Sequence, residues 1–131
     1  MNGTILVVDD DPISLSTMAN SLIQAGHDVS ISSNALDALT KINQKHFDLV
    51  FTELLLKETS SIDLCKALKK FNAKTVIILV TTAANPNAVY KNIKSFVAAG
   101  GRDEYLRKPL FAEDLPEIAN KILNEIYDQR L

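Results

Sequence analysis

Short apolar runs alternate along this chain with segments whose apolar residues recur every three or four positions, and this alternation limits the fold more than any other feature. The runs are rich in β-branched residues, which is typical of strands. They cover residues 5–8, 29–32, 48–52, 76–80 and 104–106. The intervening segments have the spacing of amphipathic helices. We expect helices at about residues 13–23, 35–45, 62–71, 88–99 and 113–127.

Strict alternation of strands and helices predicts a parallel sheet, because each parallel connection needs a crossover, and the crossover packs a helix on one face of the sheet. The runs at 5–8, 48–52 and 76–80 are almost entirely apolar, as strands buried on both faces are. The run VSIS at 29–32 alternates apolar and polar residues and suits an edge. The sequence therefore predicts an α/β fold with a doubly wound, five-stranded parallel sheet.

Helix-end residues support these boundaries. Asp11 before Pro12 is typical of an N-cap followed by proline at the first helical position. Gly26 and the pair Gly100-Gly101 stand where a helix C-terminus favours glycine. Pro116 lies inside the last predicted helix, so we expect that helix to start late or to bend there.

Length and composition favour one folded domain. We expect a single domain over residues 1–131, with a core at about 4–126 and no output domain. The chain is 47% hydrophobic and 23% charged, its formal charge is -2, and it has no basic run. These values argue against direct binding to nucleic acid, and no apolar stretch is long enough for membrane insertion. Cys65 is the only cysteine, and Met1 leads directly into a strand pattern, so we expect a cytoplasmic protein.

Polar residues follow four of the predicted strands. In a doubly wound sheet, ligands bind beyond the carboxyl ends of the strands, so these residues are the candidates for function. Crowded carboxylates need a nearby cation, and Mg²⁺ or a lysine would supply one. A hydroxyl and an ammonium opposite them would bind the remaining oxygens of a phosphoryl group. The residues are Asp9, Asp10 and Asp11, then Thr52 and Glu53, then Thr81 and Thr82, then Lys108 and Pro109.

The motifs ILVVDDDP, DLVFTELLL, VIILVTTA and EYLRKPL together resemble the receiver domain of two-component response regulators, over about residues 4–126. The resemblance implies a flavodoxin-like (CheY-like) (βα)5 fold with strand order 2-1-3-4-5 and a signalling role without enzymatic activity. It also implies a protein partner, either a histidine kinase or a downstream signalling protein, on the face made by the fourth helix, fifth strand and fifth helix. By this resemblance, Asp9 and Asp10 are the acidic pair that binds magnesium. Thr81 supplies the hydroxyl that contacts the phosphoryl group, and Lys108 is the lysine that receiver domains have at this position. Pro109 is a cis-proline, and Tyr105 is the switch aromatic.

Glu53 departs from this pattern, because receiver domains have their phosphate-accepting aspartate at this position. Glutamate moves the carboxylate outward by one methylene, roughly 1.3 to 1.5 Å. In phosphoryl transfer a misplacement of about 1 Å can cost on the order of 100-fold in rate. We therefore expect a pseudo-receiver that acts by protein–protein interaction without efficient phosphorylation. A Mg²⁺ site at Asp9, Asp10 and Glu53 would be weakened or lost.

The loop after Glu53 departs as well. Lys57, Glu58 and Ser61 stand where the family commonly has proline, glycine and glycine, so we expect a differently shaped loop. Lys57 is either a solvated lysine or a cation that reaches the pocket in place of the metal.

Several alternatives remain open from the sequence. Glu53 either holds an active-like state through Thr81 and Lys108, or only forms a salt bridge to Lys108 in a dead site, or is itself phosphorylated. Thr82 is the alternative to Thr81. A metal-dependent phosphatase would need Asp-x-Asp followed closely by Thr, and a flavodoxin-like enzyme would need a glycine-rich phosphate loop. The basic residues expected near the signalling face, either solvated or facing an acidic partner, are Lys91, Lys94, Arg102 and Arg107.

Overall fold

The computed structural model describes residues 2–57, 59–82 and 85–130. Strands and helices alternate throughout this part of the chain, as the sequence predicts. The strands are β1 (Thr4–Val8), β2 (Asp28–Ser32), β3 (Leu49–Glu53), β4 (Val76–Thr81) and β5 (Tyr105–Arg107). The helices are α1 (Pro12–Gln24), α2 (Ala35–Gln44), α3 (Ser61–Phe71), α4 (Pro86–Ala98) and α5 (Asp114–Arg130).

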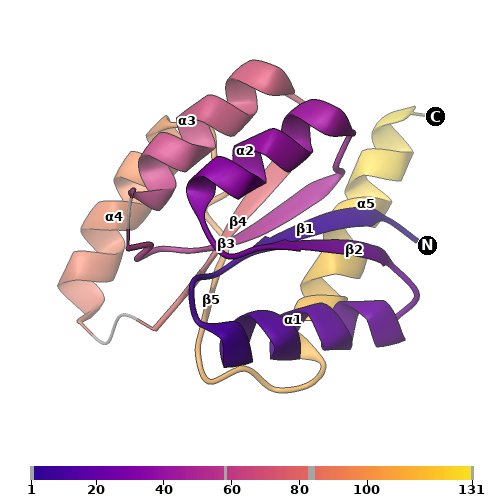
Figure 1. The fold of residues 1–131 in the computed structure, drawn as a ribbon, viewed down its shortest axis with the longest axis horizontal. Coiled ribbons are helices and arrows are strands. Elements are labelled where there is room, and N and C mark those ends of the chain that lie inside the picture. The colour runs from indigo at the N-terminus through magenta and orange to yellow at the C-terminus, as the bar shows by residue number, and fades with distance from the viewer. Residues whose placement is uncertain (1, 58, 83–84, 131) are drawn as a thin grey trace.

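The strands form one parallel sheet in the order β2-β1-β3-β4-β5, which confirms the predicted flavodoxin-like topology. β2, whose sequence alternates, lies at one edge, and the three-residue β5 lies at the other. The apolar strands β1, β3 and β4 fill the centre. In Figure 1, α1 and α5 cover one face of the sheet, and α2, α3 and α4 cover the other.

Each central strand contributes alternate residues to two separate cores, because successive side chains point to opposite faces. Toward α2, α3 and α4, the core contains Val50, Ile77 and Leu79 with the buried Cys65. Burial raises the pKa of the Cys65 thiol to about 11, so this thiol is a packing group and not a reactive one. Toward α1 and α5, the core contains the intervening residues of the same strands, including Phe51.

The predicted helix ends are present. Asp11 caps α1, and its side chain accepts a hydrogen bond from the Ser14 N–H. Gly26 has a φ of 96° and its N–H donates to the Ile23 carbonyl at 2.9 Å, while the His27 N–H donates to Leu22 at 3.2 Å. This pair of bonds is the Schellman motif, in which glycine tolerates the positive φ. Gly100 and Gly101 end α4 by the same pair of bonds, to Val97 and Phe96.

Pro116 lies in the first turn of α5, since that helix begins at Asp114. The first four N–H groups of a helix have no intrahelical acceptor, so a proline there breaks no hydrogen bond. The last helix starts one residue later than the predicted Glu113.

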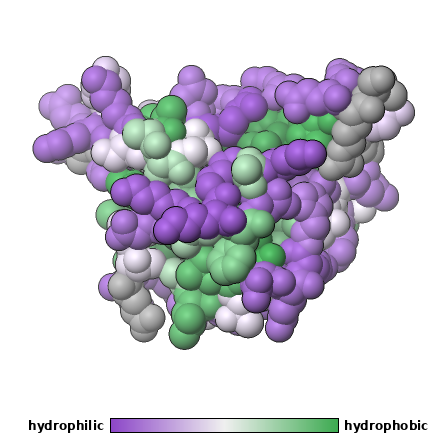
Figure 2. All heavy atoms as spheres, turned by 90° about the horizontal axis from the view of Figure 1, so that it is seen from above, coloured by the Kyte–Doolittle hydropathy of each residue, from purple (hydrophilic) through white to green (hydrophobic). Residues whose placement is uncertain are grey.

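The surface seen from above in Figure 2 is largely polar, with apolar atoms gathered in its central part. Among the exposed apolar side chains of α2 is Leu36, which is 74% exposed beside a shallow cavity of about 390 Å³.

No helix in the described part of the chain is both long enough and apolar enough to cross a bilayer.

Gly101 offers a test of packing at the end of α4. A Cβ atom built on Gly101 would lie 2.1 Å from the ring of Phe96, which is fully buried. We expect Gly101→Ala to lower the free energy of unfolding by about 1–3 kcal/mol, because the ring has no room to move. Urea unfolding followed by circular dichroism measures the change. Ser95→Ala, on the exposed side of the same helix, is the control, and an equal effect of both substitutions would contradict the packing argument.

Candidate functional site

The carboxyl end of the sheet brings two acidic side chains and one lysine together. Asp9 directly follows β1, and Glu53 is the last residue of β3, whose Thr52 pairs with Val8. Lys108 follows β5, and its N–H donates to the Thr81 carbonyl at 2.9 Å. Asp9 is 1% exposed and Glu53 is 3% exposed. Parallel strands all end on the same side, so three distant parts of the sequence meet there.

The Lys108 ammonium lies between the two carboxylates. Its Nζ is 2.5 Å from Asp9 Oδ2 and 2.8 Å from Glu53 Oε2, and the side chain is 13% exposed. Burial by itself would lower the pKa of Lys108, but the hydrogen bonds and charges of Asp9 and Glu53 outweigh it and raise the pKa. The lysine is therefore charged at neutral pH, and it neutralises one of two buried negative charges.

The second oxygen of Glu53 is held by backbone N–H groups. Oε1 accepts from Leu54 at 3.1 Å and from Leu55 at 3.4 Å, both in the loop after β3. It also accepts from the Thr82 N–H at 3.4 Å, in the loop after β4. The carboxylate thus bridges two loops and the lysine, which is the set of donors that an oxyanion requires.

Asp10 lies at the outer side of this site. Its Oδ2 accepts a hydrogen bond from the Lys57 N–H at 2.9 Å. The Lys57 side chain is exposed, so the contact between this residue and the acidic residues is made by its backbone. A cavity of about 210 Å³ lies between them and the start of α2.

The loop between Glu53 and α3 ends in a helix cap. Ser60 is the N-cap of α3 and accepts from the Asp63 N–H, and Ser61 is the buried first residue of the helix. Glu58 lies outside the described residues.

The other predicted site residues lie around the same end of the sheet. Thr81 is buried at the last position of β4, and Thr82 follows it with an exposed side chain. Tyr105 is the first residue of β5 and is 39% exposed. The Lys108-Pro109 bond is cis, as expected. The role of Thr81 in following a phosphoryl group and that of Tyr105 as a switch remain predictions.

The carboxylates do not fit a magnesium site in this arrangement. Asp9 Oδ1 accepts a hydrogen bond from the Asp11 N–H, and Asp9 Oδ2 accepts one from the Lys108 ammonium. Glu53 Oε1 accepts from the Leu54 N–H, and Glu53 Oε2 forms an ion pair with Lys108. In the described ranges no group of three or more His, Cys, Asp or Glu side chains could hold a metal ion. The Lys108 ammonium supplies the positive charge among these oxygens.

Sequence reasoning missed the backbone donors of the site. Leu54, Leu55 and Thr82 act through their N–H groups. Every residue except proline has such a group, so no residue type marks these positions. Only their place directly after β3 and β4 could have identified them.

Comparisons with known proteins agree with this geometry. The family model for the response regulator receiver domain matches residues 5–120. The chain is 36% identical over 107 residues to the transcriptional regulatory protein ZraR of Klebsiella oxytoca, covering 81% of this chain and 23% of that protein. It is 31% identical to the DNA-binding response regulator MtrA of Mycolicibacterium smegmatis, covering 88% of this chain and 48% of that protein. The chain therefore spans less than half the length of these relatives.

Among solved structures, the chain is similar to a CheY-like response regulator receiver domain protein from Methanospirillum hungatei. The TM-score is 0.88 with 28% sequence identity, and the alignment covers 98% of this chain and 99% of the other.

Lys108→Met tests the ion pairs. The substitution leaves Asp9 and Glu53 buried side by side without a cation, so we expect a loss of about 3–5 kcal/mol in the free energy of unfolding at neutral pH. Chemical denaturation measures the loss. Lys121→Met is the matched control, since it removes an exposed ammonium that pairs with Glu104, and its effect should be small. Adding Glu53→Gln to Lys108→Met should recover part of the loss, and no recovery would contradict the proposed repulsion.

Proposed function

The chain belongs to the receiver-domain family of response regulators, and from that premise we propose that it is a pseudo-receiver whose Glu53 carboxylate permanently replaces a phosphorylated aspartate. One observation carries the proposal. Glu53 Oε1 accepts from N–H groups of the loops after β3 and β4, while Oε2 pairs with Lys108. A phosphoryl group on an aspartate would need the same donors, and here they are already occupied.

The family is a signalling domain of two-component systems, so the output of this chain would be a change in protein contacts. With Glu53 held in the pocket, the loops after β3 and β4 stay joined without a phosphodonor. The domain would then signal by its abundance and by the affinity of its partner, and not by a phosphorylation cycle. We place this activity in the cytoplasm, where such partners act.

Magnesium would be dispensable for such a domain. Receiver domains typically bind Mg²⁺ in the phosphorylation site. Here Lys108 already supplies a positive charge: its ammonium pairs with Asp9 Oδ2 and Glu53 Oε2, and Asp9 Oδ1 accepts a hydrogen bond from the Asp11 N–H. We infer that Mg²⁺ binding is weakened for this reason.

The partner surface would be the face of α4, β5 and α5. Two tyrosines of these elements are exposed: Tyr90 of α4 by 63% and Tyr105 of β5 by 39%. Exposed cations lie close to them in sequence, namely Lys91, Lys94 and Arg107. Exposed aromatic rings beside cations suit a partner with an acidic surface. Arg102 is not part of this set, because Glu104 and Glu125 already pair with its guanidinium.

Phosphorylation gives the direct test. Incubated with acetyl phosphate and Mg²⁺, the wild-type chain should gain no phosphoryl group in an intact mass spectrum, whereas Glu53→Asp should gain one. The shorter side chain withdraws its carboxylate by roughly 1.5 Å, which frees the N–H donors for phosphoryl oxygens. Glu53→Gln is the control and should remain unmodified. A stoichiometric adduct on the wild-type chain that Glu53→Gln abolishes would show that Glu53 itself is phosphorylated, against the proposal.

The same variants separate an active-like pocket from a dead one. We expect the amide NMR signals of Leu54, Leu55 and Thr82 in the wild-type chain to resemble those of phosphorylated Glu53→Asp, because both hold an oxyanion on these N–H groups. Signals that match unphosphorylated Glu53→Asp instead would favour the dead site.

Magnesium binding provides an independent measurement. Titration with Mg²⁺ followed by NMR should give a larger dissociation constant for the wild-type chain than for Glu53→Asp. In Glu53→Asp the shorter carboxylate is withdrawn from Lys108, so its ion pair with the lysine no longer competes with Mg²⁺ binding. Asp10→Asn in the Glu53→Asp background should weaken binding again. Equal affinity of wild type and Glu53→Asp would contradict the inferred competition.

A further inference from the structure

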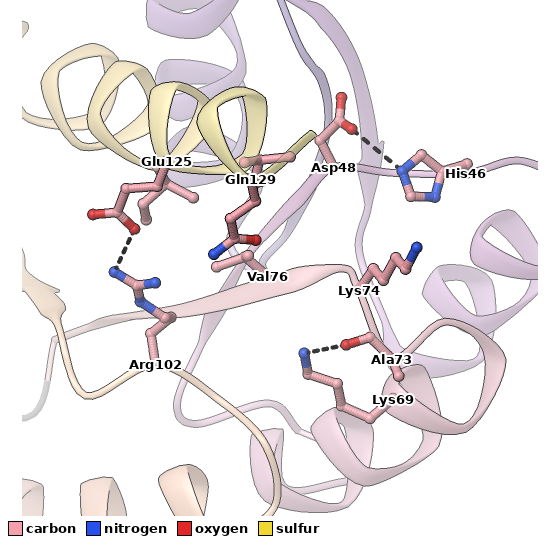
Figure 3. Close-up of a pocket in the computed structure, with 11 residues that line it drawn as sticks. His46, Asp48, Lys69, Ala73, Lys74, Val76, Arg102, Glu125 and Gln129 are labelled. Carbon is pink, nitrogen blue, oxygen red and sulfur yellow. Dashed lines mark hydrogen bonds and ion pairs between the residues drawn. The ribbon is translucent and has the colours of Figure 1, made fainter. Parts of the chain in front are cut away.

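A third cavity, of about 450 Å³, lies at the opposite end of the sheet, between the amino ends of β3 and β4 and the last turns of α5 (Figure 3). Its apolar lining comes from Val76 at the start of β4 and from Ile122 and Ile126 of α5. Asp9, Glu53 and Lys108 take no part in it. The volume lies in the range of small-molecule sites, which combine apolar walls with a few placed polar groups.

One polar wall of this cavity is fixed by hydrogen bonds. His46 Nε2 lies 3.2 Å from Asp48 Oδ1, and the other ring nitrogen contacts the side-chain amide of Asn72. Asp48 Oδ2 accepts from the Thr4 N–H at 3.0 Å, which ties this wall to β1. Both groups of the wall are therefore held in place before any ligand arrives.

A second wall is formed by Arg102 and Glu125, which are drawn facing each other in Figure 3. Arg102 Nη2 is 3.1 Å from Glu125 Oε2, and Arg102 Nε donates to Glu104 at 2.7 Å. These bonds join the segment before β5 to α5. The charge of this guanidinium is compensated within the chain.

Two lysines at the cavity have no such compensation. The Lys69 ammonium donates to the carbonyls of Ala73 and Thr75, at 3.1 and 2.6 Å, and these acceptors are neutral. Burial lowers the pKa of Lys69, as expected of a partly desolvated cation. The Lys74 ammonium and the Gln129 side-chain amide make no hydrogen bond or ion pair with the described residues. The cavity thus contains donors that lack a negative acceptor.

We propose that this cavity binds a small organic anion, with a compact apolar body against Val76 and Ile126 and an anionic group that accepts from Lys74 and Gln129. The two pre-formed walls reduce the ordering that binding requires. Within the lining, Glu125 offsets the charge of Arg102, which leaves the two lysines Lys69 and Lys74 against one further carboxylate, that of Asp48, so an anion is favoured over a cation. A bound molecule would connect the loops before β3 and β4 to α5, and this site is independent of the chemistry at Glu53.

Phenylphosphonate is a suitable probe, because it joins an aromatic ring to an anion and transfers no phosphoryl group. Titrated into the ¹⁵N-labelled chain, it should shift the amide signals of Val76, Lys74 and Ile126 and leave those of Leu54 and Thr82 unchanged. Inorganic phosphate and benzyl alcohol, each representing half of the probe, should bind more weakly than phenylphosphonate. Bound ligand should also raise the unfolding temperature with its concentration.

Matched lysine variants complete the test. Lys74→Gln should weaken phenylphosphonate binding about two- to fivefold, the loss expected of one partly exposed charge pair. Lys70→Gln, an exposed lysine of α3 outside the cavity, should leave binding unchanged. Equal binding of inorganic phosphate and phenylphosphonate, equal effects of the two substitutions, or no shifts at Val76 and Ile126 would each overturn the proposal.

Discussion

The ion pairs of Lys108 with Asp9 and Glu53 are the interaction on which the acidic site depends. Two carboxylates buried within reach of one ammonium are tolerated only because the cation offsets their repulsion and the remaining oxygens accept N–H groups. The lysine also links β5 to β1 and β3, which are not neighbours of β5 in the sheet. The same lysine therefore both balances the charge of the site and holds the ends of β1, β3 and β5 together.

This constraint is the reason why, on our proposal, one methylene at position 53 would have a large effect on phosphorylation. On that proposal, an aspartate, which is shorter by one methylene, would stop short of the Thr82 N–H and leave that donor for an incoming oxyanion. Glutamate reaches it, and so its own carboxylate satisfies the loop after β4. The negative charge at this position is the same with either residue, but on our proposal the longer side chain would make its carboxylate a competitor of the phosphoryl group and of the metal.

The fold and the acidic site could be predicted to different depths. Periodicity places the ends of the strands and helices within two residues, because burial of one or both faces sets the spacing of apolar residues. The exception is the end of α5 at Arg130, three residues beyond the predicted position 127. The meeting of Asp9, Glu53 and Lys108 follows from the parallel topology alone. The exposed side chain of Lys57 and the contact of its N–H with Asp10 could not be predicted, because loop conformation depends on backbone bonds that no residue type announces.

The cavity at the amino end of the sheet was beyond sequence reasoning for a related reason. Its lining comes from positions between His46 and Gln129, in three loops, the start of β4 and the helices α3 and α5, and no motif or period connects them. The last turns of α5 reach the start of β4, where Gln129 and Val76 line the same cavity. Asp48 is held by the Thr4 N–H, and Glu125 is held by the Arg102 guanidinium. Parallel strands bring their amino ends together as well as their carboxyl ends, but of the residues that line this cavity only Val76 belongs to a strand, and the others lie in loops and helices. A ligand at the amino end would therefore act on α5 directly, without passing through the pocket that Glu53 closes.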